Sequence, residues 1–244
     1  MKIKVGNILV NYLTYGNEKG KDVVLLHGWG QNILMMKPIG DAISRDFRIT
    51  IMDLPGFGES DRPSNVWTIY DYMECVHCLL KELHIKNPLM IGHSFGGKIT
   101  LAYASKYPCE KIILLASPFK KEIKKLSTKT KILKGLKKVP LLNRFEETAK
   151  KHIGSRDYRN ADPLMRSIMV EHVNLDLTED VKKITCPSLF IWGDMDEEVP
   201  YERAYELENL VKDGGSVILE GGTHYAYLEF QGRVVSIVRH FFEN

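Results

Sequence analysis

Ser94 lies at the centre of the motif Gly92-His93-Ser94-Phe95-Gly96, between an apolar run at 88–91 and a helical pattern at 98–107. Glycines two positions before and after the serine let the backbone pass close to itself, so the serine can occupy a tight turn with its hydroxyl pointing outward. The N-terminus of the following helix favours a developing negative charge. The five-residue motif alone is weak, but its position between a strand and a helix predicts a nucleophilic serine.

A serine hydroxyl needs a general base to take its proton and a carboxylate to hold that base. His224 follows the apolar run 216–219 and is the predicted base. The acid is expected after the run 189–192, where residues 193–200 carry four carboxylates. Spacing leaves Asp194 and Asp196 nearly equal there, because aspartate is common in turns.

The other histidines have less specific surroundings. We expect His93 to support or line the substrate pocket rather than to take the proton. Four more fall in apparent helices, where a solvated or core-satisfied imidazole is expected, and one falls in a basic segment: His77, His84, His172 and His240, and His152.

A tetrahedral oxyanion requires preorganised N–H donors. One is expected from the residue after the nucleophile, Phe95, and the other from the loop His27-Gly28-Trp29-Gly30. Trp29 N–H is the candidate in that loop, and Gly28 is a tentative pocket residue. The alternative is a turn whose aromatic ring packs beneath a cap, and both can hold because the donor would be backbone.

The elements that must position these residues alternate along the chain. A hairpin is predicted from strands at 2–5 and 8–14, with Gly6-Asn7 supplying positive-φ residues for its turn. Short apolar runs are typical of strands buried on both faces, at 23–26, 49–52, 89–91, 112–115 and 189–192. Helical patterns lie between them, the clearest at 68–83 with a Thr68–Asp71 capping box. This predicts an α/β fold, a mostly parallel doubly wound sheet with an N-terminal antiparallel hairpin, whose ligands bind at the carboxyl ends of its strands.

Residues 117–185 interrupt this alternation and carry helical patterns of their own, including one at 164–172 preceded by Asp162-Pro163. We predict a small helical cap there, inserted between core segments 1–116 and 186–244. Within it, residues 117–151 hold 12 Lys or Arg and three Glu, a local charge of +9. Such a segment could steer an acidic partner, although a lysine-rich helix is most often a solvated face and can also contact anionic lipid.

Composition narrows the function classes. The 244 residues, 44% hydrophobic and 27% charged, suit one globular α/β domain. A net charge of only +3 argues against nucleic acid as the main partner. Neither a signal peptide nor an apolar run of 18 residues is present, and the four scattered cysteines fit unremarkable thiols in a reducing cytoplasm.

Five motifs in order resemble the α/β-hydrolase superfamily over almost the full length: 27–30, 53–60, 92–96, 193–200 and 222–224. The resemblance implies that Asp196, three residues after Gly193, is the acid and that Trp29 and Phe95 supply the oxyanion N–H groups. No metal or cofactor is expected. The 53–60 stretch is mainly structural in that family. Thr223 departs from the glycine that many members have there. A serine nucleophile disfavours dehalogenase and epoxide hydrolase activities, which use aspartate.

Within that superfamily the sequence looks like small carboxylesterases, including those that cleave methyl esters of acyl groups on acyl carrier protein. The resemblance implies a small-molecule ester of a small to medium acyl group as substrate, with acyl carrier protein as a partner of the basic segment. Two alternatives remain open. One is hydrolysis of a carbon–carbon bond in a diketone, and the other is a ligand sensor that retains the triad and acts on a protein partner.

Overall fold

The computed structural model describes residues 1–121 and 162–243. In this part of the chain, eight strands form one sheet in the order β1-β2-β4-β3-β5-β6-β7-β8. β1 pairs antiparallel with β2 and β2 antiparallel with β4, whereas every other neighbouring pair is parallel. The predicted fold class, a mostly parallel sheet with an N-terminal antiparallel hairpin, is therefore confirmed.

The strands coincide with the apolar runs of the sequence. They are β1 Lys2–Val5, β2 Ile8–Gly16, β3 Asp22–Leu26, β4 Arg48–Met52, β5 Leu89–His93, β6 Lys111–Leu115, β7 Ser188–Gly193 and β8 Gly214–Leu219. The helices described are α1 Ile33–Ile43, α2 Ile69–Glu82, α3 Phe95–Lys106, α7 Pro163–Asn174, α8 Thr178–Val181, α9 Glu202–Leu210, α10 Ala226–Glu229 and α11 Gln231–Glu243.

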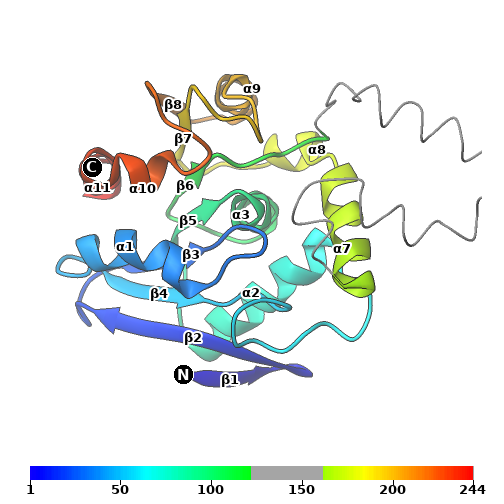
Figure 1. Cartoon of the computed structure of the whole chain (residues 1–244). Coiled ribbons are helices and arrows are strands. Elements are labelled where there is room, and N and C mark those ends of the chain that lie inside the picture. The colour runs from blue at the N-terminus through cyan, green and yellow to red at the C-terminus, as the bar shows by residue number, and fades with distance from the viewer. Residues whose placement is uncertain (122–161, 244) are drawn as a thin grey trace, which may run out of the picture.

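Helices cover both faces of the sheet (Figure 1), with α1, α10 and α11 on one side and α2, α3, α8 and α9 on the other. The central strands are apolar at most positions, because successive side chains point to opposite faces and helices cover both. In β3, Val24 and Leu26 pack under α2 and α3, whereas Val23 and Leu25 pack under α1 and α11. All four are buried, so the sheet lies at the centre of two hydrophobic cores.

The N-terminal hairpin has the predicted strands but not the predicted turn. Gly6 has φ +57°, whereas Asn7 does not have a positive φ. One glycine at the first central position is the pattern of a type II′ turn, which needs only one positive φ. The expectation of a positive φ at Asn7 was therefore wrong.

Helix α2 begins as the sequence predicts. The Thr68 side chain accepts a hydrogen bond from Asp71 N–H, and the Asp71 carboxylate accepts one from Thr68 N–H, which completes the capping box. His84 lies beyond the end of this helix with φ +57°, so its placement within a helix was wrong. A residue in the left-handed region just past the last turn is a common way for a helix to end.

Much of the predicted cap lies outside the described residues, because these omit 122–161 and with them most of the basic segment and His152. The described part contains α7 and α8. Asp162 caps α7 by accepting hydrogen bonds from Leu164 N–H and Met165 N–H, as its position before Pro163 predicted. Among the helices of the described ranges, none is long and apolar enough to cross a membrane.

A buried lysine fastens α7 to the core. Lys98 lies on α3, is almost fully buried, and its Nζ donates to the carbonyl oxygens of His172 and Leu175, each at 2.6 Å. These carbonyls belong to the last turn of α7, where intrahelical donors run out. The ammonium of Lys98 thus caps α7 from the helix that starts at Ser94.

We expect Lys98→Met to lower the free energy of unfolding by roughly 2–3 kcal/mol, because two buried carbonyls lose their donor. Chemical denaturation measures this. Lys106→Met, on the same helix, is the matched control: Lys106 is exposed and pairs with Glu74, and such a surface pair contributes at most about 1 kcal/mol. Equal effects of the two substitutions would contradict the anchoring role of Lys98.

Candidate active site

Ser94 occupies the tight turn between β5 and α3. Its backbone has φ +50° and ψ −111°, which is unusual for a residue with a side chain. Its N–H donates to Leu115 O at 2.9 Å, and its hydroxyl makes no capping hydrogen bond to α3. A Cβ at Gly92 would lie 2.5 Å from the Cα of Gly97, and one at Gly96 would collide with the carbonyl of Leu26. The turn is therefore possible only with glycine at both positions.

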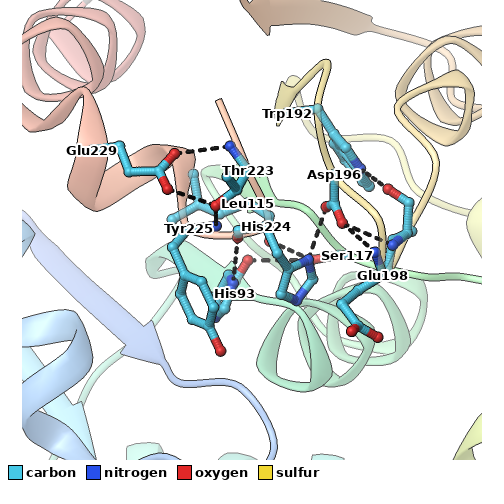
Figure 2. Close-up of polar contacts among 12 residues, drawn as sticks. His93, Leu115, Ser117, Trp192, Asp196, Glu198, Thr223, His224, Tyr225 and Glu229 are labelled. Carbon is cyan, nitrogen blue, oxygen red and sulfur yellow. Dashed lines mark hydrogen bonds and ion pairs between the residues drawn. The ribbon is translucent and has the colours of Figure 1, made fainter. Parts of the chain in front are cut away.

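Asp196 and His224 meet at the neighbouring strand ends, Asp196 after β7 and His224 after β8. Figure 2 shows the two side chains next to each other, with Asp196 Oδ2 2.8 Å from His224 Nδ1. The other oxygen of Asp196 accepts from Glu198 N–H at 2.8 Å and Val199 N–H at 2.9 Å. The Asp196 side chain has 0% exposure, so its carboxylate is desolvated and fully held by these donors.

Asp194, the alternative left open by spacing, lies differently. Its Oδ1 accepts a hydrogen bond from Gly221 N–H at 2.7 Å and so ties the loop after β7 to the loop after β8. The histidine nitrogen that faces this loop pairs with the Asp196 carboxylate instead. The geometry therefore brings Asp196, not Asp194, to the histidine.

His93 connects the serine turn to the histidine loop. It directly precedes Ser94, it is fully buried, and its Nε2 lies 3.1 Å from the carbonyl oxygen of His224. Its Nδ1 lies 3.3 Å from Gln31 Oε1, an oxygen that also accepts from Gly28 N–H at 2.9 Å. His93 thus supports three loops of the site, and Ser94 and His224 lie at the same edge of the sheet.

The loop after β3 is held from behind. His27 Nδ1–H donates to Gly28 O at 2.7 Å, and His27 Nε2 accepts from Leu54 N–H at 3.0 Å. Gly28 packs against His93, where a Cβ would come within 2.9 Å of the ring. The Trp29 ring lies edge-on to Phe57 and Phe95, 4.9 Å and 5.2 Å between centroids. The expected aromatic packing at Trp29 is therefore present.

Asp53 joins this loop to the rest of the core. Its Oδ1 accepts from Ile33 N–H, and its Oδ2 accepts from the Asn11 side-chain amide and from Glu59 N–H, each at 2.8 Å. All of these partners belong to the protein's own framework. The 53–60 stretch thus has the structural role that the resemblance implied.

Several supporting residues were not identified from the sequence. Glu229 accepts from Thr223 N–H at 2.8 Å and from the Thr223 hydroxyl at 2.6 Å, which fixes the residue before His224 (Figure 2). Gln31 and Lys98 were also missed. The Thr223–Glu229 pair is only six residues apart and could have been suspected from Thr223, a hydrogen-bond donor directly before the predicted base. Gln31 and Lys98 give no comparable local signal.

Three buried histidines near the site are held neutral. Burial lowers the pKa of His27 to about 4, and burial followed by the charge of Lys98 lowers the pKa of His172 to about 3. Burial, with the nearby His224, also lowers the pKa of His93 well below its usual value. A hydrogen bond also opposes protonation of His27, because a proton on Nε2 would displace the hydrogen bond that this nitrogen accepts from Leu54 N–H.

Comparison with known proteins agrees with this architecture. A family model described as alpha/beta hydrolase fold matches residues 22–133, which include the Ser94 turn. The structure of a bromoperoxidase from Bacillus anthracis superimposes with a TM-score of 0.80 at 22% sequence identity, covering 100% of this chain and 99% of that one. The chain has the α/β-hydrolase fold. The resemblance to the α/β-hydrolase superfamily is thereby confirmed.

Sequence relatives of this hydrolase-fold chain carry different activity names. It is 25% identical to a pimeloyl-[acyl-carrier protein] methyl ester esterase from Aeromonas hydrophila subsp. hydrophila, over 91% of this chain and 96% of the relative. It is 26% identical to a proline iminopeptidase from Heyndrickxia coagulans, over 92% and 91% respectively. Both relatives match almost end to end.

The neutral histidines predict a loss of stability in mild acid. In the unfolded chain their pKa is near 6.5, so below that pH the unfolded state binds more protons than the folded state, and the free energy of unfolding falls as pH falls. The fall should continue to about pH 4 for His27 and about pH 3 for His172. Each histidine that stays unprotonated in the folded state adds roughly 1 kcal/mol per pH unit to this slope near pH 5. Urea denaturation at pH 7, 6 and 5 measures the slope.

The His172→Phe variant isolates the contribution of His172 to this pH dependence from those of the other histidines and of the carboxylates. The variant keeps an aromatic ring but cannot bind a proton, so its slope at pH 5 should be smaller than that of the wild type by roughly 1 kcal/mol per pH unit. Identical slopes would show that His172 is not held neutral in the folded protein.

Proposed function

We propose that this protein is a serine hydrolase that cleaves a carboxylic ester through an acyl-enzyme intermediate on Ser94. The observation that carries the proposal is the 2.8 Å contact between His224 Nδ1 and the fully buried Asp196 carboxylate. A carboxylate at this position fixes the proton on Nδ1 and leaves Nε2 able to accept one. The same carboxylate stabilises the imidazolium that forms when Nε2 takes the serine proton.

The reaction then has two halves. Ser94 Oγ attacks the ester carbonyl carbon while its proton passes to His224 Nε2, and the carbonyl oxygen becomes an oxyanion. Collapse of this intermediate breaks the bond to the alcohol oxygen, which leaves with the proton from His224. In the second half, water attacks the carbonyl carbon of the acyl-enzyme while its proton passes to His224. The bond to Ser94 Oγ then breaks, Ser94 regains its proton from His224, and the acid leaves.

The oxyanion is assigned to the backbone N–H groups of Phe95 and Trp29. Phe95 is the first residue of α3, so its N–H is one of those with no intrahelical acceptor. The dipole of α3 points its positive end at the same place. Trp29 is held by ring packing against Phe57 and Phe95, which supports a fixed backbone position in its loop.

We propose an ester rather than a carbon–carbon bond as the bond that is cleaved, because one relative is named as a methyl ester esterase. Another relative is named as an iminopeptidase, so similar chains also cleave other bonds. In this proposal, residues 117–185 form the cap that holds the acyl group, and His93 and Gly28 support the pocket from the core. A reducing, cytoplasmic location goes with it, because Cys75, Cys78, Cys109 and Cys186 are free thiols.

We expect Ser94→Ala to lower kcat for p-nitrophenyl butyrate by about a million-fold, because the nucleophile is lost and only oxyanion stabilisation and binding remain. We expect Asp196→Asn to lower kcat by about ten-thousand-fold, because an amide favours the wrong tautomer of His224. Stopped-flow and steady-state release of p-nitrophenol measure both.

Asp194→Asn is the matched control. The side-chain amide oxygen of this variant can still accept from Gly221 N–H, so kcat should stay within about threefold of the wild type. Ester turnover at the wild-type rate in the Ser94→Ala variant would disprove the proposed nucleophile. Equal losses in the two aspartate variants would remove the argument for Asp196.

The carrier of the acyl group is proposed from charge. Residues 117–151 carry +9, the relative named above acts on an acyl-carrier-protein ester, and acyl carrier proteins are acidic. We therefore propose acyl carrier protein as a partner that reaches the site along this basic segment.

The salt dependence of kcat/KM distinguishes recognition of a carrier-linked substrate from recognition of a free one. For the methyl ester of an acyl group on acyl carrier protein, kcat/KM should fall at least tenfold between about 20 mM and 500 mM NaCl, because screening weakens charge steering. For the corresponding free methyl ester it should change less than twofold. Equal salt dependence for both substrates would contradict recognition of the carrier by charge.

A further inference from the structure

His172 is a buried imidazole that makes no hydrogen bond through its ring. The residue is 8% exposed, and within the described part of the chain neither Nδ1 nor Nε2 has a partner. The other two buried histidines of the site differ, because each ring nitrogen of His27 and His93 lies within hydrogen-bond distance of a protein group. The expectation that His172 is a solvated or core-satisfied histidine was therefore wrong, because its ring nitrogens are buried and have no partner.

The ring of His172 lies against the two residues assigned to the oxyanion. It stacks on Trp29 with 5.0 Å between centroids and an interplanar angle of 29°, and it lies 4.7 Å from the Phe95 ring. Around it, α7 directs the buried side chains of Met165, Ile168 and Met169 inward. His172 is thus a polar group in a wall of aromatic and aliphatic side chains beside the proposed reaction site.

A phenylalanine would make the same ring contacts without desolvating two polar nitrogens, so packing does not account for a histidine here. Both nitrogens lie beneath the surface, and a ligand oxygen reaches them only when a neighbouring side chain moves. Met165 and Met169 are suited to such movement, since unbranched methionine side chains rearrange easily. The unused donor and acceptor point to a partner that is not part of the chain.

The charge of the surroundings limits what that partner can be. Burial and Lys98, whose Nζ donates to the His172 carbonyl, keep the ring neutral and lower its pKa to about 3. A neutral imidazole has one N–H donor and one acceptor nitrogen. A cation would be repelled by Lys98. A carboxylate would lose its hydration without gaining an ion pair to the neutral ring, and the Lys98 ammonium that would attract it already donates to two carbonyl oxygens at the end of α7. An uncharged oxygen fits best.

We infer that His172 is a substrate-binding residue that hydrogen-bonds a hydroxyl or keto oxygen carried by the acyl group of the ester. The inference rests on the proposed function, which places the acyl group against α7. It narrows the substrate class from acyl esters in general to oxygenated acyl esters, and it gives His172 a role in specificity separate from the chemistry at Ser94.

The test compares a plain methyl ester, methyl hexanoate, with analogues bearing one hydroxyl or keto oxygen at successive carbons of the acyl chain. For at least one analogue, the wild type should favour the oxygenated ester in kcat/KM, and His172→Phe should reduce that preference about tenfold, the usual effect of losing one buried hydrogen bond. His77→Phe is the matched control. His77, on α2, also has an unpartnered Nδ1, and its ring stacks on Tyr107 with 3.7 Å between centroids. Tyr107 lies at the end of α3 that is far from Ser94. The His77→Phe variant should leave the preference unchanged.

Binding is measured separately, by calorimetry with the same esters and the Ser94→Ala variant, with and without His172→Phe. An oxygen preference in binding that His172→Phe removes, without any wild-type turnover, would overturn the proposed function and support the role of His172. A preference that survives His172→Phe, or no preference in turnover and binding, would overturn the inference. A His172-dependent preference for the monomethyl ester of a dicarboxylic acid would overturn the assignment to an uncharged oxygen.

Discussion

The tight backbone turn at Ser94 is the constraint on which the other features of the site depend. It requires a positive φ at a residue with a side chain, and it brings α3 so close to β5 and to the end of β3 that only glycine fits at 92 and 96. The close approach places the first N–H groups of α3 beside the loop that carries Trp29. A larger residue at either glycine would separate the helix from the strands and move Ser94 away from both the proposed oxyanion donors and the loop that carries His224.

Neutral histidines then lock the loops around this turn. His27 joins the loop after β3 to the loop after β4, and His93 joins the loop after β3 to the one that carries His224. Their low pKa values keep positive charge out of the layer beneath the site. A cationic imidazole there would compete with His224 for the Asp196 carboxylate. Structural imidazoles that resist protonation therefore keep a competing positive charge away from the buried carboxylate beside His224.

Local pattern predicted the elements, and it could not predict contacts made across them. Continuous apolar runs identified the strands of the parallel sheet, and the Thr68 box identified the start of α2. The chain order of Ser94, Asp196 and His224 followed from strand ends, but the choice between Asp194 and Asp196 needed either a resemblance or the geometry of two loops. Lys98 and the carbonyls it caps are more than 70 residues apart. Such partners are set by how α7 lies on α3, which no pattern within either helix encodes.

Helix α3 connects the position of α7, and with it the proposed substrate-binding residue His172, to the proposed nucleophile Ser94. Lys98 lies four residues after Ser94, about one turn of α3, so the ammonium that holds the end of α7 is fixed relative to the serine. Because Lys98 binds the carbonyl of His172 itself, it positions that residue's ring against Trp29 and Phe95 and also disfavours its protonation. A single buried charge therefore orients the imidazole and, together with burial, keeps it neutral, as the proposed recognition of an uncharged oxygen requires. The proposed substrate-binding group and the proposed nucleophile are in this way held to the same rigid element, although His172 belongs to the predicted cap and Ser94 to the core.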